Sequence, residues 1–325
     1  MISRMEFKQT RRIKMRHLSA FVETVRCGSL KGAAERMFLT QPTVSKTLAD
    51  LEHILGVTLL HRGRAGIALT REGAVFRQFA EQGLAAVDHG LTSLAALSAG
   101  RAAPLRIGTL PSVSADLLPD VILQFERLSP ATPVTVIEGP IATSIDGLRA
   151  GDLDLVIGRM GSPDRMNGIS FTQLYSERVV FAAARHHPAE GVRDASALAE
   201  HRVLYPPPNA AIRPLVDRFM IEKGIAAFPR LLETVSAAFG RAMMLGPAHA
   251  VWIISQGVVA RDVAAGRVSI LPIDTDSMSG PVGMMTRSEE EPTPALRLFR
   301  QALADTLDEG RHHPAPHRSR GFTTT

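Results

Sequence analysis

Two short helical segments joined by only three residues restrict the fold of this chain more than any other feature. The first covers residues 29–37 and carries the small pair Ala33-Ala34, and the second begins at Gln41-Pro42. Proline is accommodated in the first turn of a helix because its missing N–H would have no intrahelical partner there. The apolar residues of the second segment recur at helical spacing, at Val44, Leu48, Leu51 and Leu55. Small residues at the crossing and so short a connection predict a helix-turn-helix.

The flanking segments complete a winged helix-turn-helix domain over residues 14–73. Residues 15–27 have the apolar spacing of a further helix, which Gly28 is expected to end, and Ser29 is expected to cap the next helix. Gly56 is expected to end the second helix of the motif. Residues 57–73 predict a strand, a glycine-containing turn and a second strand, which is the arrangement of a β-wing.

The positive charge of the chain is concentrated in this domain. Residues 1–75 hold 13 Lys and Arg against 6 Asp and Glu, a net charge of +7. The rest of the chain holds the remaining 24 of 37 basic residues against 26 of 32 acidic ones, a net charge of −2. A basic module joined to a near-neutral body is typical of a domain that binds a polyanion, although a solvated basic face would give the same count.

Residues 74–101 predict a long helix that links this head to the rest of the chain. Residues 71–99 contain no proline, and their apolar side chains are spaced four and three apart, which is typical of a coiled-coil seam. The residues of this seam are Ala80, Leu84, Val87, Leu91 and Leu94. We interpret the segment as a dimerisation helix, and a helix that packs against its own domain is the alternative.

Beyond residue 101, short β-rich runs alternate with helical stretches, which predicts βαβ units and a parallel sheet. We expect two Rossmann-like α/β lobes within residues 102–308. One lobe would comprise residues 102–180 and 273–308, and the other residues 181–272. The expected fold class is therefore α/β with an N-terminal all-α winged helix-turn-helix.

The termini and the cysteine content indicate the compartment. Residues 1–13 predict a basic, disordered extension and residues 309–325 a polar, disordered tail. The chain has no apolar run long enough to span a membrane and no apolar core of a secretory signal. The single cysteine, Cys27, excludes an intramolecular disulfide and suits a reducing compartment. We therefore expect a cytoplasmic protein.

The residues of the head form a pattern that points to one family. The pattern comprises Ala33-Ala34, Thr40-Gln41-Pro42-Thr43-Val44-Ser45, Leu51-Glu52, Leu55-Gly56, Leu59, Arg62, Leu69-Thr70 and Gly73. It resembles the DNA-binding region of LysR-type transcriptional regulators, with Leu60 in place of the usual aromatic residue before the wing. The linker helix and the two lobes, which resemble periplasmic solute-binding proteins, extend the likeness over residues 15–305.

Several stretches of the two lobes resemble one subgroup of that family. They are LYSERVVFAA, ETVSAAFGRAMM, VWIISQGVVA and GPVGMMTR. These stretches resemble the regulators of protocatechuate (pca) catabolism and of a galactose-binding protein. The resemblance implies an effector from aromatic catabolism, such as protocatechuate or a carboxymuconate-type ring-opened acid. A regulator of a sugar or amino-acid uptake operon with a different effector is the alternative.

The second helix of the motif would present its first turns to the major groove of double-stranded DNA. Gln41 can pair with adenine through two hydrogen bonds, and the Thr43 methyl can touch thymine. Lys46, Arg36 and the arginines of the wing would bind phosphates. Thr40 could instead only cap the helix, and Ser45 could be solvated. The expected DNA-binding residues are Arg36, Thr40, Gln41, Pro42, Thr43, Ser45, Lys46, Arg62, Arg64 and Arg71.

The effector site is expected where the strands of the lobes end, because open α/β sheets bind ligands beyond the carboxyl ends of their strands. Helix N-termini and an arginine at these ends would suit a small carboxylate. Ser112 could instead only cap its helix, and Arg159 could pair with a nearby acid such as Asp164. The resemblance adds Ile141 and the segment at Pro207. The expected effector-binding residues are Ser112, Ser114, Ile141, Thr143, Arg159, Pro207, Asn209, Arg213 and Ser236.

An enzyme and a solute-binding transport component are the two alternatives to a regulator. An α/β enzyme is disfavoured because the sequence has no GxSxG, Walker, HExxH or zinc-ligand spacing, and no metal or cofactor is expected. A solute-binding transport component would need a signal peptide and would not need a basic head. The family resemblance implies homodimers or homotetramers on spaced inverted half-sites, and contact with RNA polymerase if the protein is an activator.

Overall fold

The computed structural model of the chain describes residues 12–63, 66–98, 102–288 and 290–309. The extension at residues 1–13 and the tail at residues 309–325 fall almost wholly outside these ranges. The fold contains an N-terminal unit, which comprises residues 12–98 and 146–153, and an α/β unit, which comprises residues 102–145 and 154–309.

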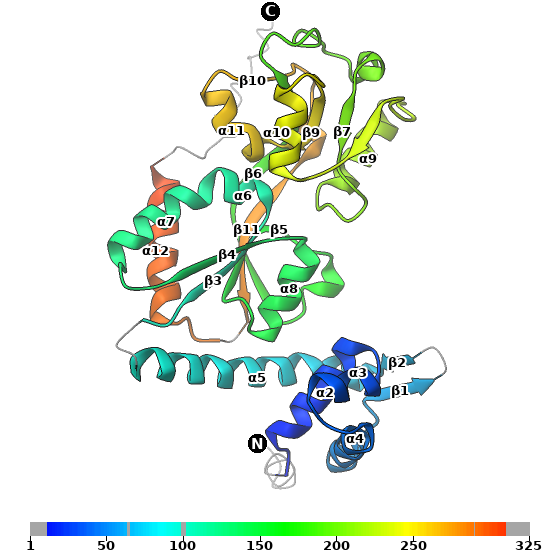
Figure 1. The fold of residues 1–325 in the computed structure, drawn as a ribbon, viewed down its shortest axis with the longest axis vertical. Helices are drawn as coiled ribbons and strands as arrows, with labels where there is room; N and C mark the ends of the chain where they lie inside the picture. The colour runs from blue at the N-terminus through cyan, green and yellow to red at the C-terminus, as the bar shows by residue number, and fades with distance from the viewer. Residues whose placement is uncertain (1–11, 64–65, 99–101, 289, 310–325) are drawn as a thin grey trace, which may run out of the picture. The chain divides into compact units, whose positions relative to one another are not determined.

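The N-terminal unit is a winged helix-turn-helix followed by a long helix, as predicted. Its helices are α2 (Met15–Cys27), α3 (Leu30–Arg36), α4 (Gln41–Leu55) and α5 (Arg71–Ser98), and its wing strands are β1 (Leu60–Gly63) and β2 (Gly66–Leu69) (Figure 1). The wing strands pair antiparallel from Leu60 opposite Leu69 to Gly63 opposite Gly66. Phe21, Val44, Leu48 and Leu51 are fully buried in the shared core.

Local capping fixes the ends of these helices where the sequence placed them. Gly28 and Gly56 adopt left-handed backbone conformations with φ of 64° and 72°, which side chains with a Cβ rarely adopt. Ser29 Oγ accepts a hydrogen bond from Gly32 N at 3.1 Å at the start of α3. At the start of α4, Thr40 Oγ1 accepts from Thr43 N at 3.4 Å. The motif is therefore specified by short-range signals at both joints.

Glu52 connects the second helix of the motif to the wing. Its Oε1 atom accepts hydrogen bonds from the backbone N–H groups of Leu59, at 2.7 Å, and Leu60, at 3.2 Å. Gly73 lies at the other end of the wing, where an added Cβ would come within 2.0 Å of the Leu59 carbonyl oxygen. These two signature residues therefore hold the wing in place.

The long helix α5 divides the expected coiled-coil seam into two parts. Ala80 is buried and Leu84 is partly buried against the core of the N-terminal unit. Val87, Leu91 and Leu94 are 46%, 61% and 63% exposed. The first half of the helix thus packs on its own domain, as the alternative interpretation expected. Its second half presents apolar side chains to the surface, and dimerisation through them stays a prediction.

The α/β unit contains a mixed sheet: the predicted parallel pairing is found within two groups of strands, but two strands between these groups pair antiparallel, which the sequence did not predict. The strands are β3 (Leu105–Thr109), β4 (Val134–Glu138), β5 (Leu155–Arg159), β6 (Ile169–Ala184), β7 (Val203–Tyr205), β8 (Leu231–Glu233), β9 (Val251–Ser255), β10 (Val268–Ile270) and β11 (Ser279–Arg287). They follow the order β4-β3-β5-β11-β6-β9-β7-β8, and β10 pairs with β6. Neighbours within β4-β3-β5 and within β9-β7-β8 are parallel, whereas β6 and β11 pair antiparallel with all their neighbours.

Helices cover the sheet and fill the connections between its strands. They are α6 (Pro111–Ala115), α7 (Leu117–Leu128), α8 (Ile141–Ala150), α9 (Arg213–Glu222), α10 (Ala237–Leu245), α11 (Gln256–Ala264) and α12 (Pro294–Asp308), with short 3-10 helices at Pro163–Arg165, Ala195–Glu200 and Asp276–Met278. The C-terminal helix α12 returns to the first lobe and packs on α7, where the Phe125 and Phe299 rings lie 5.8 Å apart.

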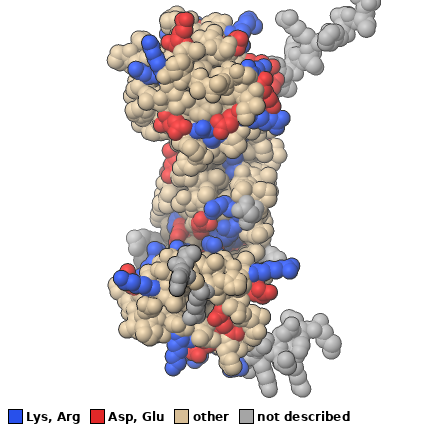
Figure 2. Space-filling model, turned by 90° about the vertical axis from the view of Figure 1, so that its right-hand side faces the viewer, with Lys and Arg blue, Asp and Glu red and all other residues tan. Residues whose placement is uncertain are grey.

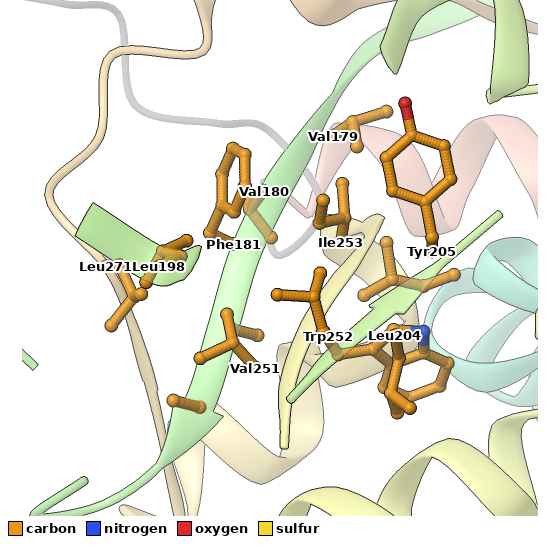
Figure 3. Close-up of a cluster of buried hydrophobic side chains, with 14 of the residues drawn as sticks. Val179, Val180, Phe181, Leu198, Leu204, Tyr205, Val251, Trp252, Ile253 and Leu271 are labelled. Carbon is orange, nitrogen blue, oxygen red and sulfur yellow. The ribbon is translucent and has the colours of Figure 1, made fainter. Parts of the chain in front are cut away.

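The long strand β6 belongs to both lobes (Figure 1). Its residues up to Arg178 pair with β11, and its residues from Val179 pair with β9. The first core is built around Ile107, Phe125 and Phe299. The second is built around the fully buried Trp252, and Figure 3 shows its side chains on β6, β7 and β9. The chain therefore passes from the first lobe to the second within the continuous strand β6, between Arg178 and Val179.

The buried side chain of His187 connects two loops of the second lobe. The His187 side chain accepts a hydrogen bond at Nδ1 from Ala189 N, at 3.0 Å, so Nε2 carries the proton and donates to the His249 carbonyl at 2.9 Å. The ring of His201 lies 5.0 Å away. Burial lowers the pKa of His187 below its ordinary value of 6.5. The folded lobe therefore requires the neutral imidazole.

Acid should consequently destabilise the second lobe. The pKa of His187 is lower in the folded state, so below about pH 6.5 the unfolded chain binds a proton that the folded chain excludes. The stability that neutral His187 provides is present above that pH and is lost as the pH falls toward the folded-state pKa. Urea unfolding followed by the fluorescence of Trp252, the single tryptophan, measures it. His187→Gln should flatten the dependence between pH 7.5 and 5; an unchanged slope would contradict this assignment.

Candidate DNA-binding surface and effector cavity

The first turns of α4 present the side chains that the sequence assigned to DNA. Gln41, Pro42, Thr43 and Lys46 are exposed, and Ser45 is half-buried. Val44 and Leu48, on the opposite face, are fully buried. The apolar side of the helix thus anchors it to the domain while its polar side stays accessible.

Thr40 and Thr43 act together at the start of α4. Their hydroxyl oxygens lie 2.8 Å apart in a hydrogen bond, in addition to the capping bond from Thr43 N. The Thr43 carbonyl also accepts from Thr47 Oγ1 at 2.9 Å. Thr40 is therefore a capping residue, as the alternative interpretation had it, and it also holds the Thr43 side chain.

The arginines assigned to phosphate contacts differ in their surroundings. Arg36 forms an ion pair with Glu23 on α2, with Nε 2.8 Å from Oε2, while its side chain remains 59% exposed. The Glu23 side chain is only 19% exposed and also pairs with Arg26, so Arg36 keeps an exposed guanidinium beside an acid that has a second partner. Arg71 is exposed at the start of α5. The side chain of Arg62 and all of Arg64 lie outside the described residues. Basic and acidic side chains are interspersed on the face shown in Figure 2.

A cavity of about 240 Å³ lies within the α/β unit, where residues of both lobes meet. It is bordered by the ends of strands β4 and β9 and by the starts of helices α6, α8, α10 and α11. Most of its wall is apolar. The lining residues are Leu110, Pro111, Ser112, Glu138, Gly139, Pro140, Ile141, Asn209, Ala210, Ala211, Ile212, Val235, Ser236, Ile254, Ser255 and Val258.

The structure brings four of the nine expected effector residues to this cavity and places five elsewhere. Ser112, Ile141, Asn209 and Ser236 line it. The residues that are not part of its lining are Ser114, Thr143, Arg159, Pro207 and Arg213. Ser114 stands beside it, because its hydroxyl donates a hydrogen bond to Glu138. Sequence reasoning missed Glu138 and Ser255, although each is the last residue of a strand and the same carboxyl-end rule would have found it.

Arg159 is buried beside the cavity lining and pairs with an acid of its own unit. Its side chain is 7% exposed, and its Nη2 donates to the Glu177 carbonyl at 3.0 Å and lies 3.5 Å from Glu177 Oε2. The acid named from the sequence, Asp164, has no described side chain, and the partner is Glu177 on the next strand. Arg159 thus pairs with an internal acid, as the alternative interpretation expected, because a buried guanidinium needs a counter-charge. Its contact with a carboxylate ligand stays a prediction.

Arg213 is also occupied by acids of its own lobe. Its Nε lies 2.7 Å from Asp217 Oδ1 and its Nη1 lies 2.8 Å from Glu233 Oε1. The guanidinium also stands over the Tyr205 ring, 4.9 Å from its centre. Among the described residues that line the cavity, none is Lys or Arg. An anion in it would therefore have to be stabilised by backbone N–H groups and hydroxyls.

Glu177 joins the two lobes beneath the cavity. Its Oε2 accepts a hydrogen bond from Ser112 Oγ of α6 at 3.0 Å, and its Oε1 accepts from Gly257 N of α11 at 3.1 Å. Burial raises the pKa of Glu177, and Arg159 together with these donors opposes that rise. Because Ser112 also lines the cavity, a ligand there would touch a group that already bonds to Glu177. We call these four residues, Ser112, Arg159, Glu177 and Gly257, the interlobe clasp.

The described residues show neither a metal site nor a membrane segment. No group of three His, Cys, Asp or Glu side chains among them could hold a metal ion. Within the same ranges, no helix has both the length and the apolar content needed to cross a membrane.

Comparison with known proteins identifies both parts of the chain. Residues 15–74 match the family described as "Bacterial regulatory helix-turn-helix protein, lysR family", and residues 98–308 match "LysR substrate binding domain". The chain belongs to the LysR family of transcriptional regulators. It is 42% identical over 300 residues to the HTH-type transcriptional regulator PcaQ of Agrobacterium fabrum, which covers 92% of this chain and 96% of that protein.

Solved structures of LysR-type regulators share the fold. Full-length LysG from Corynebacterium glutamicum with bound effector Arg has a TM-score of 0.58 and 22% identity, and the match covers 91% of this chain and 99% of that one. CbnR in complex with its target DNA has a TM-score of 0.51 and 20% identity, with 90% and 99% covered. The likeness to PcaQ confirms the expected resemblance to the pca subgroup. As a member of this family, the chain is a transcriptional regulator rather than an enzyme.

Gly257 allows the interlobe clasp to close. An added Cβ would lie 2.8 Å from both the Ser112 carbonyl oxygen and Glu177 Oε1. Gly257→Ala should therefore lower the free energy of unfolding of the α/β unit by about 1–3 kcal/mol through overpacking. Urea unfolding followed by Trp252 fluorescence measures this. Gly191→Ala is the matched control, because an added Cβ there has nothing within 4 Å; equal effects of the two variants would refute the role of Gly257.

Proposed function

We propose that this LysR-type regulator responds to a small anionic metabolite of aromatic catabolism, which binds in the cavity between the two lobes. One observation carries the proposal: the cavity is lined by residues of both lobes, and its Ser112 hydroxyl bonds to the buried Glu177 of the interlobe clasp. A ligand that competes for Ser112 would change the contact that holds the lobes together. The 42% identity to PcaQ supports an effector from the pca pathway.

The chemistry of the cavity suits a small acid with an apolar body. Leu110, Ile212, Ile254 and Val258 supply apolar walls. The starts of α8 and α10 border the same space, and the start of a helix carries a positive dipole end and backbone N–H groups that suit an anion. Such groups stabilise a carboxylate without an arginine. Glu138 and Asn209 could accept hydrogen bonds from hydroxyl groups of the ligand.

The exposed face of α4 would read the operator. Gln41 is exposed at the first helical position and could pair with adenine, while Lys46 would contact a phosphate. Arg36, Arg62, Arg64 and Arg71 remain proposed phosphate contacts. Helix-turn-helix domains generally place the start of their second helix in the major groove, which supports this proposal.

The exposed apolar residues of the N-terminal unit support self-association. Val87, Leu91 and Leu94 lie on the second half of α5, and Val57, Val75 and Phe79 border a shallow groove near its start. A homodimer or homotetramer that covers these side chains would place two reading helices on spaced half-sites. Contact with RNA polymerase would follow if the regulator is an activator, and a reducing, cytoplasmic setting suits the single Cys27.

Gln41→Ala should weaken operator binding selectively. Loss of a bidentate base contact should lower the affinity for operator DNA by about 1–3 kcal/mol and leave binding to random DNA nearly unchanged. Gel shift at fixed salt, with a site selected from random duplexes by the wild-type protein, measures both affinities. Gln173→Ala, at an exposed position of the α/β unit, is the control. Equal losses on operator and random DNA would show that Gln41 does not read a base.

Ligand binding should raise the melting temperature of the wild-type protein. A ligand at 100 times its Kd stabilises the folded state by about 2.7 kcal/mol. Protocatechuate, a carboxymuconate-type acid, galactose and an amino acid form the panel, each checked by isothermal titration. Ala211→Leu, which fills the cavity wall, should abolish the shift, whereas Ala226→Leu at an exposed site should keep it. A shift with galactose alone would overturn the carboxylate proposal.

A further inference from the structure

The turn of the helix-turn-helix contains an aromatic side chain that the fold does not use. Phe38 is 95% exposed, the largest exposed fraction among the large hydrophobic residues described. Its backbone has φ of 55°, in the left-handed region. Apolar side chains in small domains are generally buried, so both features call for an explanation.

The backbone geometry around Phe38 is that of a helix C-terminal motif that normally contains glycine. Leu39 N donates to the Ala34 carbonyl at 2.9 Å and Phe38 N donates to the Glu35 carbonyl at 3.2 Å. These two bonds form a Schellman motif, with Phe38 at the position where glycine or asparagine is preferred. A bulky residue there is strained, and strained residues cluster at functional sites.

Phe38 therefore has an unfavourable backbone position and gains no burial in return. Glycine or asparagine would close the same turn with less strain. What Phe38 provides is an exposed apolar side chain in the turn directly before α4. Leu39, the next residue, is 45% exposed, and Gln41, Pro42 and Thr43 in the first turn of that helix are exposed as well.

We propose that Phe38 is a specificity-determining residue that contacts thymine methyl groups in the operator. This inference rests on the proposed DNA-reading role of α4. The start of that helix enters the major groove, where the C5-methyl of thymine is the apolar group that a phenyl ring can touch. The excess positive charge of residues 1–75 draws DNA to this unit. The strain at Phe38 is retained because the side chain acts in the complex.

Phe38→Asn separates folding from DNA binding. Asparagine tolerates the left-handed conformation, so the melting temperature should stay the same or rise. Affinity for a site selected from random duplexes by the wild-type protein should fall about tenfold. The slope of log affinity against log salt should not change, because no phosphate contact is lost, whereas Lys46→Ala should reduce it by about one. Phe239→Asn, at a 46% exposed position of α10, is the matched control and should leave affinity unchanged.

Replacement of thymine by deoxyuridine in the selected site identifies the atom contacted. Wild-type protein should lose affinity at one or two positions, and Phe38→Ala should show no further loss there. Unchanged affinity of Phe38→Asn, or equal uracil effects on wild type and Phe38→Ala, would overturn the inference. So would a change of oligomeric state in light scattering, which would assign Phe38 to a contact between copies. If the wild type selects no site at all, the proposed DNA-reading role of α4 fails instead.

Discussion

A buried carboxylate, Glu177, is the interaction on which the α/β unit depends most. It lies on β6, the strand that both lobes share, and receives hydrogen bonds from Ser112 of one lobe and Gly257 of the other. A buried ionised group is costly unless it is paired and hydrogen-bonded, so the positions of Arg159, α6 and α11 are coupled to it. The cavity is built on the same contact, because Ser112 is both a donor to Glu177 and part of the cavity wall.

The sequence suggested that Arg159 and Arg213 bind a ligand, whereas in the structure both arginines pair with acids of the protein. The arginines near the strand ends neutralise buried or neighbouring acids: Arg159 pairs with Glu177, and Arg213 pairs with Asp217 and Glu233. The cavity is left with backbone amides, hydroxyls and apolar side chains. A site of that kind selects for shape and hydrogen bonding more than for total charge, since each amide contributes only a partial charge.

In the N-terminal unit, by contrast, short-range sequence features such as capping residues and apolar spacing determine most of the structure. Helices α3 and α4 begin at the capping side chains of Ser29 and Thr40. Helices α2 and α4 end at Gly28 and Gly56, so all these ends are set by residues adjacent to the helices. The buried side chains of Val44, Leu48 and Leu51 then give α4 one buried face, which leaves the opposite face exposed. Phe38 is the exception, because its left-handed backbone and its exposed ring both disfavour folding. Residues of this kind are expected at functional sites.

The sequence by itself determined the winged helix-turn-helix, the long helix and the presence of α/β lobes, because caps, glycine stops and apolar periodicity act over a few residues. It also identified Ser112, Ile141, Asn209 and Ser236, which lie at or near strand ends and helix starts. Only the tertiary structure decided the antiparallel pairing of β6 and β11, the pairing of Arg159 with Glu177 and the exposure of Phe38. Strand pairing, burial and ion pairing all depend on contacts between segments that are far apart in the sequence. A local sequence pattern does not specify such contacts.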